Sequence, residues 1–288
     1  MKAGATAEPI TIEYDDAGTV KTIFTLPPTK SPDKPSVYAF SLHKAGSVLL
    51  DSVLRSLCDR VGLTYVSLMT EFFRLGLAEK DVPSSASRVF ADGGYCFGGF
   101  RSFPKTFEIP NLGRRKSVLL VRDPRDMLVS HYYSMRSSHP DPGKVLTTSM
   151  QGLSRRDAAL KLSVDEYALD YASYYARQLD RYIAVLEKNR GNFALFRYED
   201  VIFNKRQWIA DICEAFDWDV SASAMSRIAK RNDIVPSAED EGRHIRQVAP
   251  GDGMRKLQPE TIKKLNAMFT QQFSFFGYDQ AAMATPEP

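Results

Sequence analysis

Short apolar runs alternate along the chain with longer stretches in which apolar residues recur at helical spacing. The short runs lie at residues 37–42, 64–68, 87–92, 117–123 and 192–200, and each predicts a strand. Helices are predicted at residues 46–62, 124–138 and 164–189, and again near the end at 259–278. Strands separated by helices predict an α/β fold, a three-layer sandwich with a central, mostly parallel sheet.

The first part of the chain has a different pattern. Two β-prone runs within residues 10–26 flank an Asp-Asp-Ala-Gly turn, which predicts a small hairpin. A linker rich in proline, lysine and aspartate follows at residues 27–35. We therefore expect a hairpin and linker at residues 1–35 and the main domain at residues 36–288.

The composition is that of an ordinary globular protein of 288 residues, with 43% hydrophobic and 25% charged residues. These values exclude the disordered, collagen-like and coiled-coil classes. The net charge is only +3, from 38 basic and 35 acidic residues, so bulk charge does not indicate a nucleic-acid partner. Any site for an anion must be local.

The cysteines also constrain the class of protein. Cys58, Cys96 and Cys213 are far apart and lack metal-ligand spacing, so we expect neither a disulfide scaffold nor a metal site. The first residues contain no apolar segment typical of a secretory signal, and no apolar run is long enough to span a membrane. We expect a cytoplasmic protein.

The end of the first strand carries the first candidate chemistry. The run at residues 37–42 is followed by His43-Lys44-Ala45-Gly46-Ser47 and then by a helix. Free N–H groups at a helix start, the helix dipole and a mobile lysine can together hold a phosphate or a sulfate. The alternative is an ordinary turn with a solvated lysine. A complete Walker A motif is not present.

A second strand end carries an arginine. Arg122 falls at the strand end within the run at 117–123, Pro124 opens the next helix, and Ser130 lies two turns along it. A guanidinium there suits bidentate binding of a phosphate, and Asp123 and Asp126 suit the helix start. The alternative is a structural Arg–Asp pair.

These segments resemble the sulfotransferases that use 3′-phosphoadenosine-5′-phosphosulfate (PAPS). Residues 43–49, the first segment, are similar to the family's P-K-S-G-T-T-W loop, and residues 122–130, the second segment, match its Arg-[Asn/Asp]-Pro-x-Asp pattern with a following serine. The third segment, residues 196–200, ends a strand in Tyr-Glu-Asp. The fourth segment, residues 246–253, is similar to R-K-G-x-x-G-D-W. The resemblance spans residues 36–278.

The resemblance implies a P-loop-NTPase-like sulfotransferase fold, PAPS as sulfuryl donor, and a role for each matching residue. Lys44 would contact the transferring sulfuryl group and its bridging oxygen. The other implied donor-binding positions are the backbone amides of Ala45, Gly46, Ser47 and Val48 for the 5′-phosphate, Arg122, Ser130 and Arg246 for the 3′-phosphate, and Tyr198 beside the adenine. The acceptor would be a hydroxyl of a small molecule or saccharide. The alternatives are a P-loop nucleotide kinase-like enzyme and a non-catalytic nucleotide-binding relative.

The acceptor also needs a base. Many members of the family carry a histidine after a strand resembling residues 87–92, where this chain has none, and Asp92 is the nearest group able to take a proton. Asp92 is therefore predicted as the base, with Glu71 and His43 as alternatives. The alternative interpretations without a catalytic role are that Asp92 is a turn residue and that Glu71 is a solvated residue on a helix.

Other side chains receive simpler interpretations. His131 and His139 are expected at the surface or beside the acceptor. The glycine pairs around Tyr95, Cys96 and Phe97 suggest a mobile acceptor loop. Tyrosines at helix-face spacing within residues 164–189 are expected in the core or at its rim.

Overall fold

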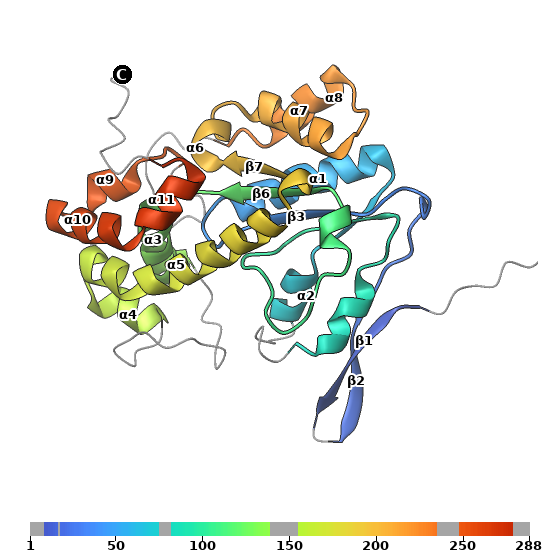
Figure 1. The fold of residues 1–288 in the computed structure, drawn as a ribbon, viewed down its shortest axis with the longest axis horizontal. Coiled ribbons are helices and arrows are strands. Elements are labelled where there is room, and N and C mark those ends of the chain that lie inside the picture. Colours follow the sequence, from blue (N-terminus) through green and yellow to red (C-terminus); the bar gives the residue numbers. More distant parts are fainter. Residues whose placement is uncertain (1–8, 17, 75–81, 139–154, 235–247, 279–288) are drawn as a thin grey trace, which may run out of the picture.

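The computed structural model describes residues 9–16, 18–74, 82–138, 155–234 and 248–278. Its centre is a five-stranded parallel sheet in the order β4-β5-β3-β6-β7. Figure 1 labels β3, β6 and β7 of this sheet. The strands are β3 (Val37–Ser41), β4 (Thr64–Val66), β5 (Tyr95–Phe97), β6 (Ser117–Val121) and β7 (Phe193–Arg197). Neighbours pair in parallel, so all carboxyl ends lie at one edge of the sheet, where ligands bind in open α/β folds. The predicted α/β class is confirmed.

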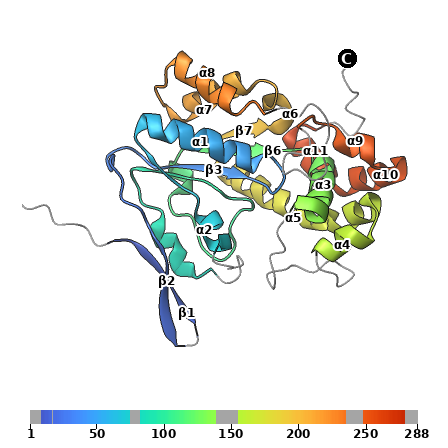
Figure 2. The same cartoon turned by 180° about the vertical axis from the view of Figure 1, so that it is seen from behind.

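Helices cover both faces of the sheet. One face carries α1 (Ser47–Val61), α7 (Lys205–Phe216) and α8 (Ala222–Arg231), which Figures 1 and 2 show above the sheet. The core on the other face includes α2 (Leu68–Arg74), α3 (Pro124–Tyr133) and α5 (Val164–Lys188). Short helices pack around α3 and α5, namely α4 (Arg155–Lys161), α9 (Asp252–Lys256), α10 (Pro259–Met268) and α11 (Thr270–Phe276). Helix α6 (Tyr198–Val201) directly follows β7.

Strand β3 shows why the sheet is buried on both sides. All of its residues are buried, as expected for a central parallel strand that reads as a continuous apolar run. Val37 and Ala39 belong to the core beneath α1, α7 and α8, whereas Tyr38 and Phe40 belong to the core that contains α3 and α5. The period of two along the strand thus divides one run between two cores.

The helix boundaries follow local signals in the sequence. Helix α1 buries Leu50, Leu54 and Leu57 at three- and four-residue spacing. Helix α5 begins with a capping box, in which the Ser163 hydroxyl accepts from the Glu166 N–H at 3.2 Å and the Glu166 carboxylate accepts from the Ser163 N–H at 2.8 Å. These features position the loop before α1 and the long helix beneath the sheet.

The N-terminal hairpin is present, formed by the antiparallel strands β1 (Thr11–Asp16) and β2 (Thr19–Thr25). It projects from the body of the molecule in Figure 1. Its base is attached, because Ile12 is fully buried and the Tyr95 hydroxyl donates to the carbonyl of Pro27 at 2.8 Å. The division into residues 1–35 and 36–288 stays a prediction.

The strand predicted at residues 87–92 is wrong. Ser84–Val89 forms a 3₁₀ helix instead, because Ala86 and Val89, three positions apart, are both buried on one side of that turn. The strand of this region is β5, in the stretch predicted to be a mobile loop. Its three residues are all buried, because it lies between β4 and β3.

Two other predicted elements end earlier than expected. The helix at 124–138 is α-helical only to Tyr133 and continues as a π-helical turn over Ser134–Ser138. The strand at 192–200 ends at Arg197, because Tyr198 begins α6. Within the described part of the chain, no helix has both the length and the apolar character needed to cross a membrane.

Candidate active site

The loop between β3 and α1 is shaped by two residues in the left-handed region. Lys44 has φ 69° and Gly46 has φ 90°. Gly46 is the N-cap residue of α1, and no side-chain hydrogen bond caps this helix end. A Cβ atom at position 46 would lie 2.9 Å from Cδ2 of Tyr198, so close packing also requires glycine. The first N–H groups of α1 therefore face an anion-compatible loop without a side-chain cap.

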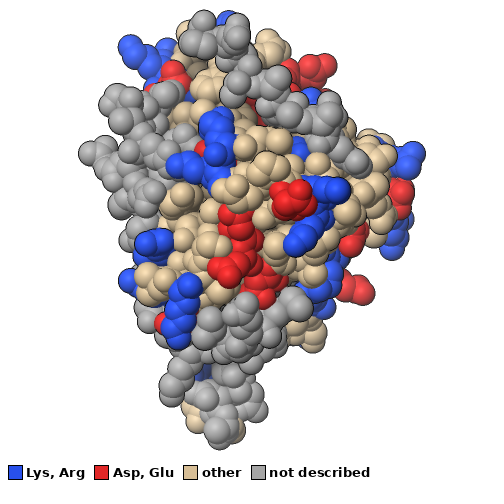
Figure 3. Space-filling model, turned by 90° about the vertical axis from the view of Figure 1, so that its left-hand side faces the viewer, with Lys and Arg blue, Asp and Glu red and all other residues tan. Residues whose placement is uncertain are grey.

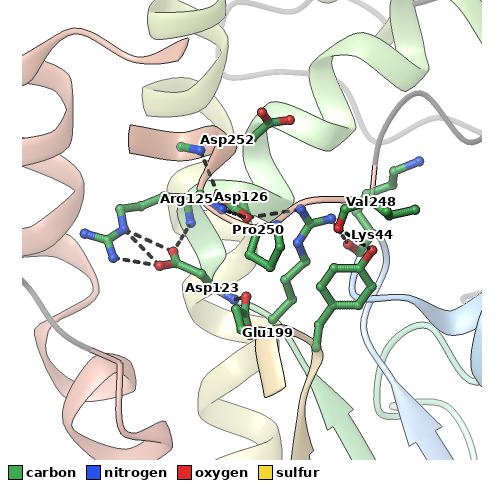
Figure 4. Close-up of polar contacts among 12 residues, drawn as sticks. Lys44, Asp123, Arg125, Asp126, Glu199, Val248, Pro250 and Asp252 are labelled. Atoms are coloured by element: carbon green, nitrogen blue, oxygen red, sulfur yellow. Dashed lines mark hydrogen bonds and ion pairs between the residues drawn. The ribbon is translucent and has the colours of Figure 1, made fainter. Parts of the chain in front are cut away.

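Arg122 contacts Lys44 of the loop and Asp126 of α3, both of which Figure 4 labels. Its side chain is buried, its Nη2 donates to Oδ2 of Asp126 at 3.1 Å, and its Nη1 reaches the carbonyl oxygen of Lys44 at 3.5 Å. The guanidinium also lies over the ring of Tyr198, 4.5 Å from the centroid. Its Nε is buried and has no hydrogen-bond partner. The structural Arg–Asp pair is thus present, and the Nε–H donor of Arg122 has no hydrogen-bond partner.

Asp126 connects the second segment to the fourth. Besides the pair with Arg122, its carboxylate accepts hydrogen bonds from the backbone N–H groups of Gly251 at 2.8 Å and Gly253 at 2.7 Å. A Cβ atom at position 253 would lie 2.5 Å from Cβ of Arg125. The tryptophan that the family pattern has at this position would therefore clash, and the glycine of this chain allows the close approach.

The third segment packs against the loop between β3 and α1. The Tyr198 hydroxyl donates to the carbonyl of Val248 at 3.0 Å, and its buried ring packs against Gly46 and Arg122. Glu199 accepts from the backbone N–H of Asp123 at 2.9 Å. Tyr198 is thus placed as a support for Arg122 and the loop, while its proposed contact with adenine stays a prediction.

Asp123 and Arg125 fix the start of α3. The Asp123 carboxylate caps the helix by accepting from the Arg125 N–H at 2.8 Å, as the sequence predicts. It also forms a buried ion pair with the Arg125 guanidinium at 2.6 Å, which extends to Asn266 on α10 at 2.9 Å. These contacts hold the strand end that carries Arg122.

The remaining predicted donor-binding residues are placed as follows. Ser47 is buried at the first position of α1, and Val48 is exposed. Ser130 is half-buried on α3, one turn after Asp126. Arg246 lies outside the described residues. The described parts of all four segments therefore meet at the carboxyl edge of the sheet.

Asp92, predicted as the acceptor base, lies at the opposite edge of the sheet from Lys44. The carbonyl of Asp92 accepts from the N–H of Ser36, which precedes β3, so Asp92 lies at the amino ends of the strands. Lys44 follows the other end of β3, about 15 Å away for a strand of this length. The Asp92 carboxylate is exposed and pairs with Arg115 at 2.5 Å, and this contact lowers its pKa, which also weakens it as a base.

The two alternative bases lie at the correct edge of the sheet. Glu71 is on α2, after β4, where it pairs with Arg74 at 3.0 Å. His43 directly precedes Lys44 and contacts His131, with the two ring centroids 5.2 Å apart. His131 is 1% exposed, so of the two places expected for it, the surface is excluded, while a place beside the acceptor stays a prediction. His139 lies outside the described residues.

The charge of the site is internal rather than spread over the surface. Figure 3 shows the side of the molecule that carries α10, with acidic side chains gathered near the centre of the face and basic ones around them. This face is not a broad basic surface. The buried Arg122 at the meeting of the segments is a local cation, as the small net charge of +3 requires for any anion site.

Glu199 gives the site a predicted pH dependence. Burial raises the pKa of Glu199 to about 7, although the Asp123 N–H and Arg122 favour its charged form. The folded state then binds this proton more tightly than the unfolded state, so this carboxyl lowers the free energy of unfolding as pH rises from about 4.5 to about 7. Glu199→Gln should remove up to about 3 kcal/mol of that decline.

Urea denaturation at pH 5 and pH 7.5 measures this effect in the wild type and the variant. Glu214→Gln, an exposed position on α7, is the matched control and should keep the wild-type pH dependence. If Glu199→Gln also keeps it, Glu199 does not carry the raised pKa.

Comparison with known proteins agrees with this geometry. The sulfotransferase domain family matches residues 100–276, which include the second, third and fourth segments. A mouse sulfotransferase, SULT7A1, solved in complex with PAP, is similar over 83% of this chain and 84% of its own, with 17% identity and a TM-score of 0.51. No curated protein matches the chain at a significant level.

Two structures of retinol dehydratase have the same fold. One, in complex with androsterone and the inactive cofactor PAP, has a TM-score of 0.55 and 15% identity, over 83% of this chain and 80% of its own. The other, in complex with retinol and PAP, has a TM-score of 0.52 and 14% identity, over 91% of this chain and 85% of its own.

Proposed function

This chain belongs to the sulfotransferase family, and on that premise we propose that it transfers a sulfuryl group from PAPS to a hydroxyl of a small molecule or a saccharide. One observation carries the proposal. Arg122 is buried where the four segments meet, and its Nε has no partner there. A buried donor without a partner is costly, and an anionic oxygen would satisfy it.

The residues present fit a doubly phosphorylated nucleotide. The uncapped start of α1 supplies backbone N–H groups for the 5′-phosphate, and Lys44 adds a cation beside them. Arg122, which directly follows β6, and Ser130 on α3 supply donors for the 3′-phosphate. Arg246 would add a further cation. The donor brings a sulfuryl group that is already activated by its bond to phosphate.

Lys44 has the chemical role that matters most for rate. Charge moves onto the bridging oxygen as the bond to the transferring group breaks, and an ammonium aimed at that oxygen stabilises the charge as it develops. The left-handed conformation of Lys44 and the contact of its carbonyl with Arg122 hold the loop in one arrangement. The backbone of Lys44 is therefore fixed at the start of α1.

A small hydroxyl compound is the acceptor class that we favour. Androsterone and retinol, which are bound in two structures of the same fold, are small molecules with a hydroxyl group. The kinase-like alternative is disfavoured because the loop lacks the G-x-x-x-x-G-K-[ST] pattern. We also propose a cytoplasmic location.

The test uses PAPS labelled in its sulfuryl group and a panel of phenols, aliphatic alcohols and saccharides. The proposal predicts that the label moves to at least one acceptor. The desulfated product, 3′-phosphoadenosine-5′-phosphate (PAP), should be released in equal amount. Binding of PAP without transfer to any acceptor or to water would instead support the non-catalytic nucleotide-binding relative.

A further inference from the structure

We propose that His43 is the catalytic base that takes the proton from the acceptor hydroxyl, and that the buried His131 positions it. The inference rests on the proposed function and adds a residue pair to it. It replaces the assignment of Asp92, which lies at the wrong edge of the sheet.

The backbone places His43 beside the reacting group. His43 follows the carboxyl end of β3 and is adjacent in sequence to Lys44. Its N–H donates to the carbonyl of Arg101 at 2.9 Å, which ties the loop to the segment that leaves β5. The side chain is half-buried, so one part is packed and another part is accessible. Among the candidate bases of the described chain, His43 is the one on the same loop as Lys44.

His131 holds the ring of His43 from the side of α3. The two rings meet edge to face, with an interplanar angle of 90° and centroids 5.2 Å apart. His131 is in turn fixed by α5, because the Tyr167 hydroxyl lies 3.1 Å from its Nδ1. Tyr171 and Tyr175 meet the His131 ring edge-on at 5.6 Å and 5.8 Å.

A polar cluster in this place needs a reason. Burying imidazole and phenol groups costs free energy compared with apolar side chains of similar size. Simple packing between α3 and α5 would be served equally well by leucine or phenylalanine. A histidine held in a fixed orientation next to a half-buried histidine is instead the arrangement expected of a base and the residue that positions it.

The chemistry balances without any further reactant. The acceptor oxygen forms the new bond to sulfur, and the bond from sulfur to the bridging oxygen breaks. The electron pair of that bond leaves on the phosphate of PAP, where Lys44 stabilises it. The acceptor proton goes to a ring nitrogen of His43, which suits this step because imidazole titrates close to neutral pH.

Glu71 is the competing base, and its contacts disfavour it. Its carboxylate is 40% exposed and is engaged by Arg74 at 3.0 Å on the same helix. Helix α2 follows β4, which is separated from β3 by β5. A proton acceptor must come within hydrogen-bond reach of the acceptor hydroxyl, and the residue beside Lys44 is better placed for that.

The experiment compares His43→Asn, His43→Ala and Glu71→Gln with the wild type. Single-turnover release of PAP from PAPS is measured with the panel acceptor that the wild type uses fastest, and affinity for PAP is measured by calorimetry. We expect His43→Asn to be about 100-fold slower, with PAP affinity within about twofold of the wild type. Added imidazole should restore part of the rate of His43→Ala and none of the rate of Lys44→Ala.

His131 requires a readout that separates positioning from folding. His131→Phe keeps the ring volume but loses the contact with the Tyr167 hydroxyl, so kcat should fall about tenfold with KM and PAP affinity unchanged. His131→Gln retains a group that can accept that hydrogen bond and should recover part of the loss.

The outcomes distinguish this inference from the proposed function. A wild type that transfers to no acceptor and releases no PAP overturns both. An active wild type together with a His43→Asn variant of near-normal rate overturns the inference alone, and an inactive Glu71→Gln variant in that case assigns the base to Glu71. A slow His43→Asn variant without imidazole rescue of His43→Ala also counts against a base.

Discussion

Lys44→Ala is expected to lower kcat about 100-fold or more, a loss of roughly 2.7 kcal/mol or greater in transition-state stabilisation. Its ammonium is most useful when charge develops on the bridging oxygen, and an interaction that strengthens along the reaction affects kcat more than binding. Affinity for PAP should fall much less, because backbone N–H groups of α1 and Arg122 would still hold the phosphates. Single-turnover transfer and calorimetric titration of the same variant measure the two effects.

Two further variants sharpen this prediction. Lys263→Ala removes an exposed lysine of α10 and should leave both quantities unchanged. Lys44→Arg should restore only part of the rate, since a planar guanidinium cannot place its charge as an ammonium does. A Lys44→Ala variant with the wild-type transfer rate would make Lys44 a solvated loop lysine.

Arg122→Ala should weaken the binding of PAP about tenfold or more, because removal of a charge-assisted hydrogen bond costs about 1.5–3 kcal/mol. The structure adds a second effect. Arg122 forms a buried ion pair with Asp126, and removing one partner of such a pair costs about 3–5 kcal/mol of folding free energy. Urea denaturation and calorimetry measure the two effects separately.

A double variant keeps the binding prediction testable if Arg122→Ala does not fold. Arg122→Met with Asp126→Asn removes both charges together, so it should fold more stably than Arg122→Ala and still bind PAP weakly. Arg227→Ala, an exposed arginine on α8, should bind PAP like the wild type. Normal affinity in the folded double variant would mean that Arg122 is structural only.

The positions of Lys44 and Arg122 at neighbouring strand ends were predictable from the sequence because the signals are local. A strand, a short loop and a helix start lie next to each other in the chain, so apolar periodicity alone placed Lys44 and Arg122 at strand ends. The capping role of Asp123 also follows from its place before Pro124.

The acceptor side was not predictable in the same way. Strand β5 has three residues, too few for a periodic signal, and its burial comes from β3 and β4, which lie elsewhere in the chain. Without a signal for β5, the pattern predicts the strand of this region at residues 87–92, which ends at Asp92. The contact of His43 with His131 joins residues far apart in sequence, and only packing of α3 against the loop brings them together.

The role of Asp126 shows the same limit. Its place in the first turn of α3 predicts an interaction with the helix start. Its carboxylate instead accepts from Gly251 and Gly253, more than a hundred positions along the chain, and pairs with Arg122. A close match of two glycine N–H groups to one carboxylate is a property of the folded chain and has no local sequence signal.

The most direct measurement of the central claim is calorimetric titration of the wild-type protein with PAP and, separately, with AMP. The two nucleotides differ in the 3′-phosphate, which Arg122 and Ser130 are proposed to bind, and the measurement needs no knowledge of the acceptor. We expect PAP to bind at least about tenfold more tightly than AMP, as a charge-assisted contact to that phosphate requires. Equal affinity for PAP and AMP would contradict the assignment of these segments as a PAPS site.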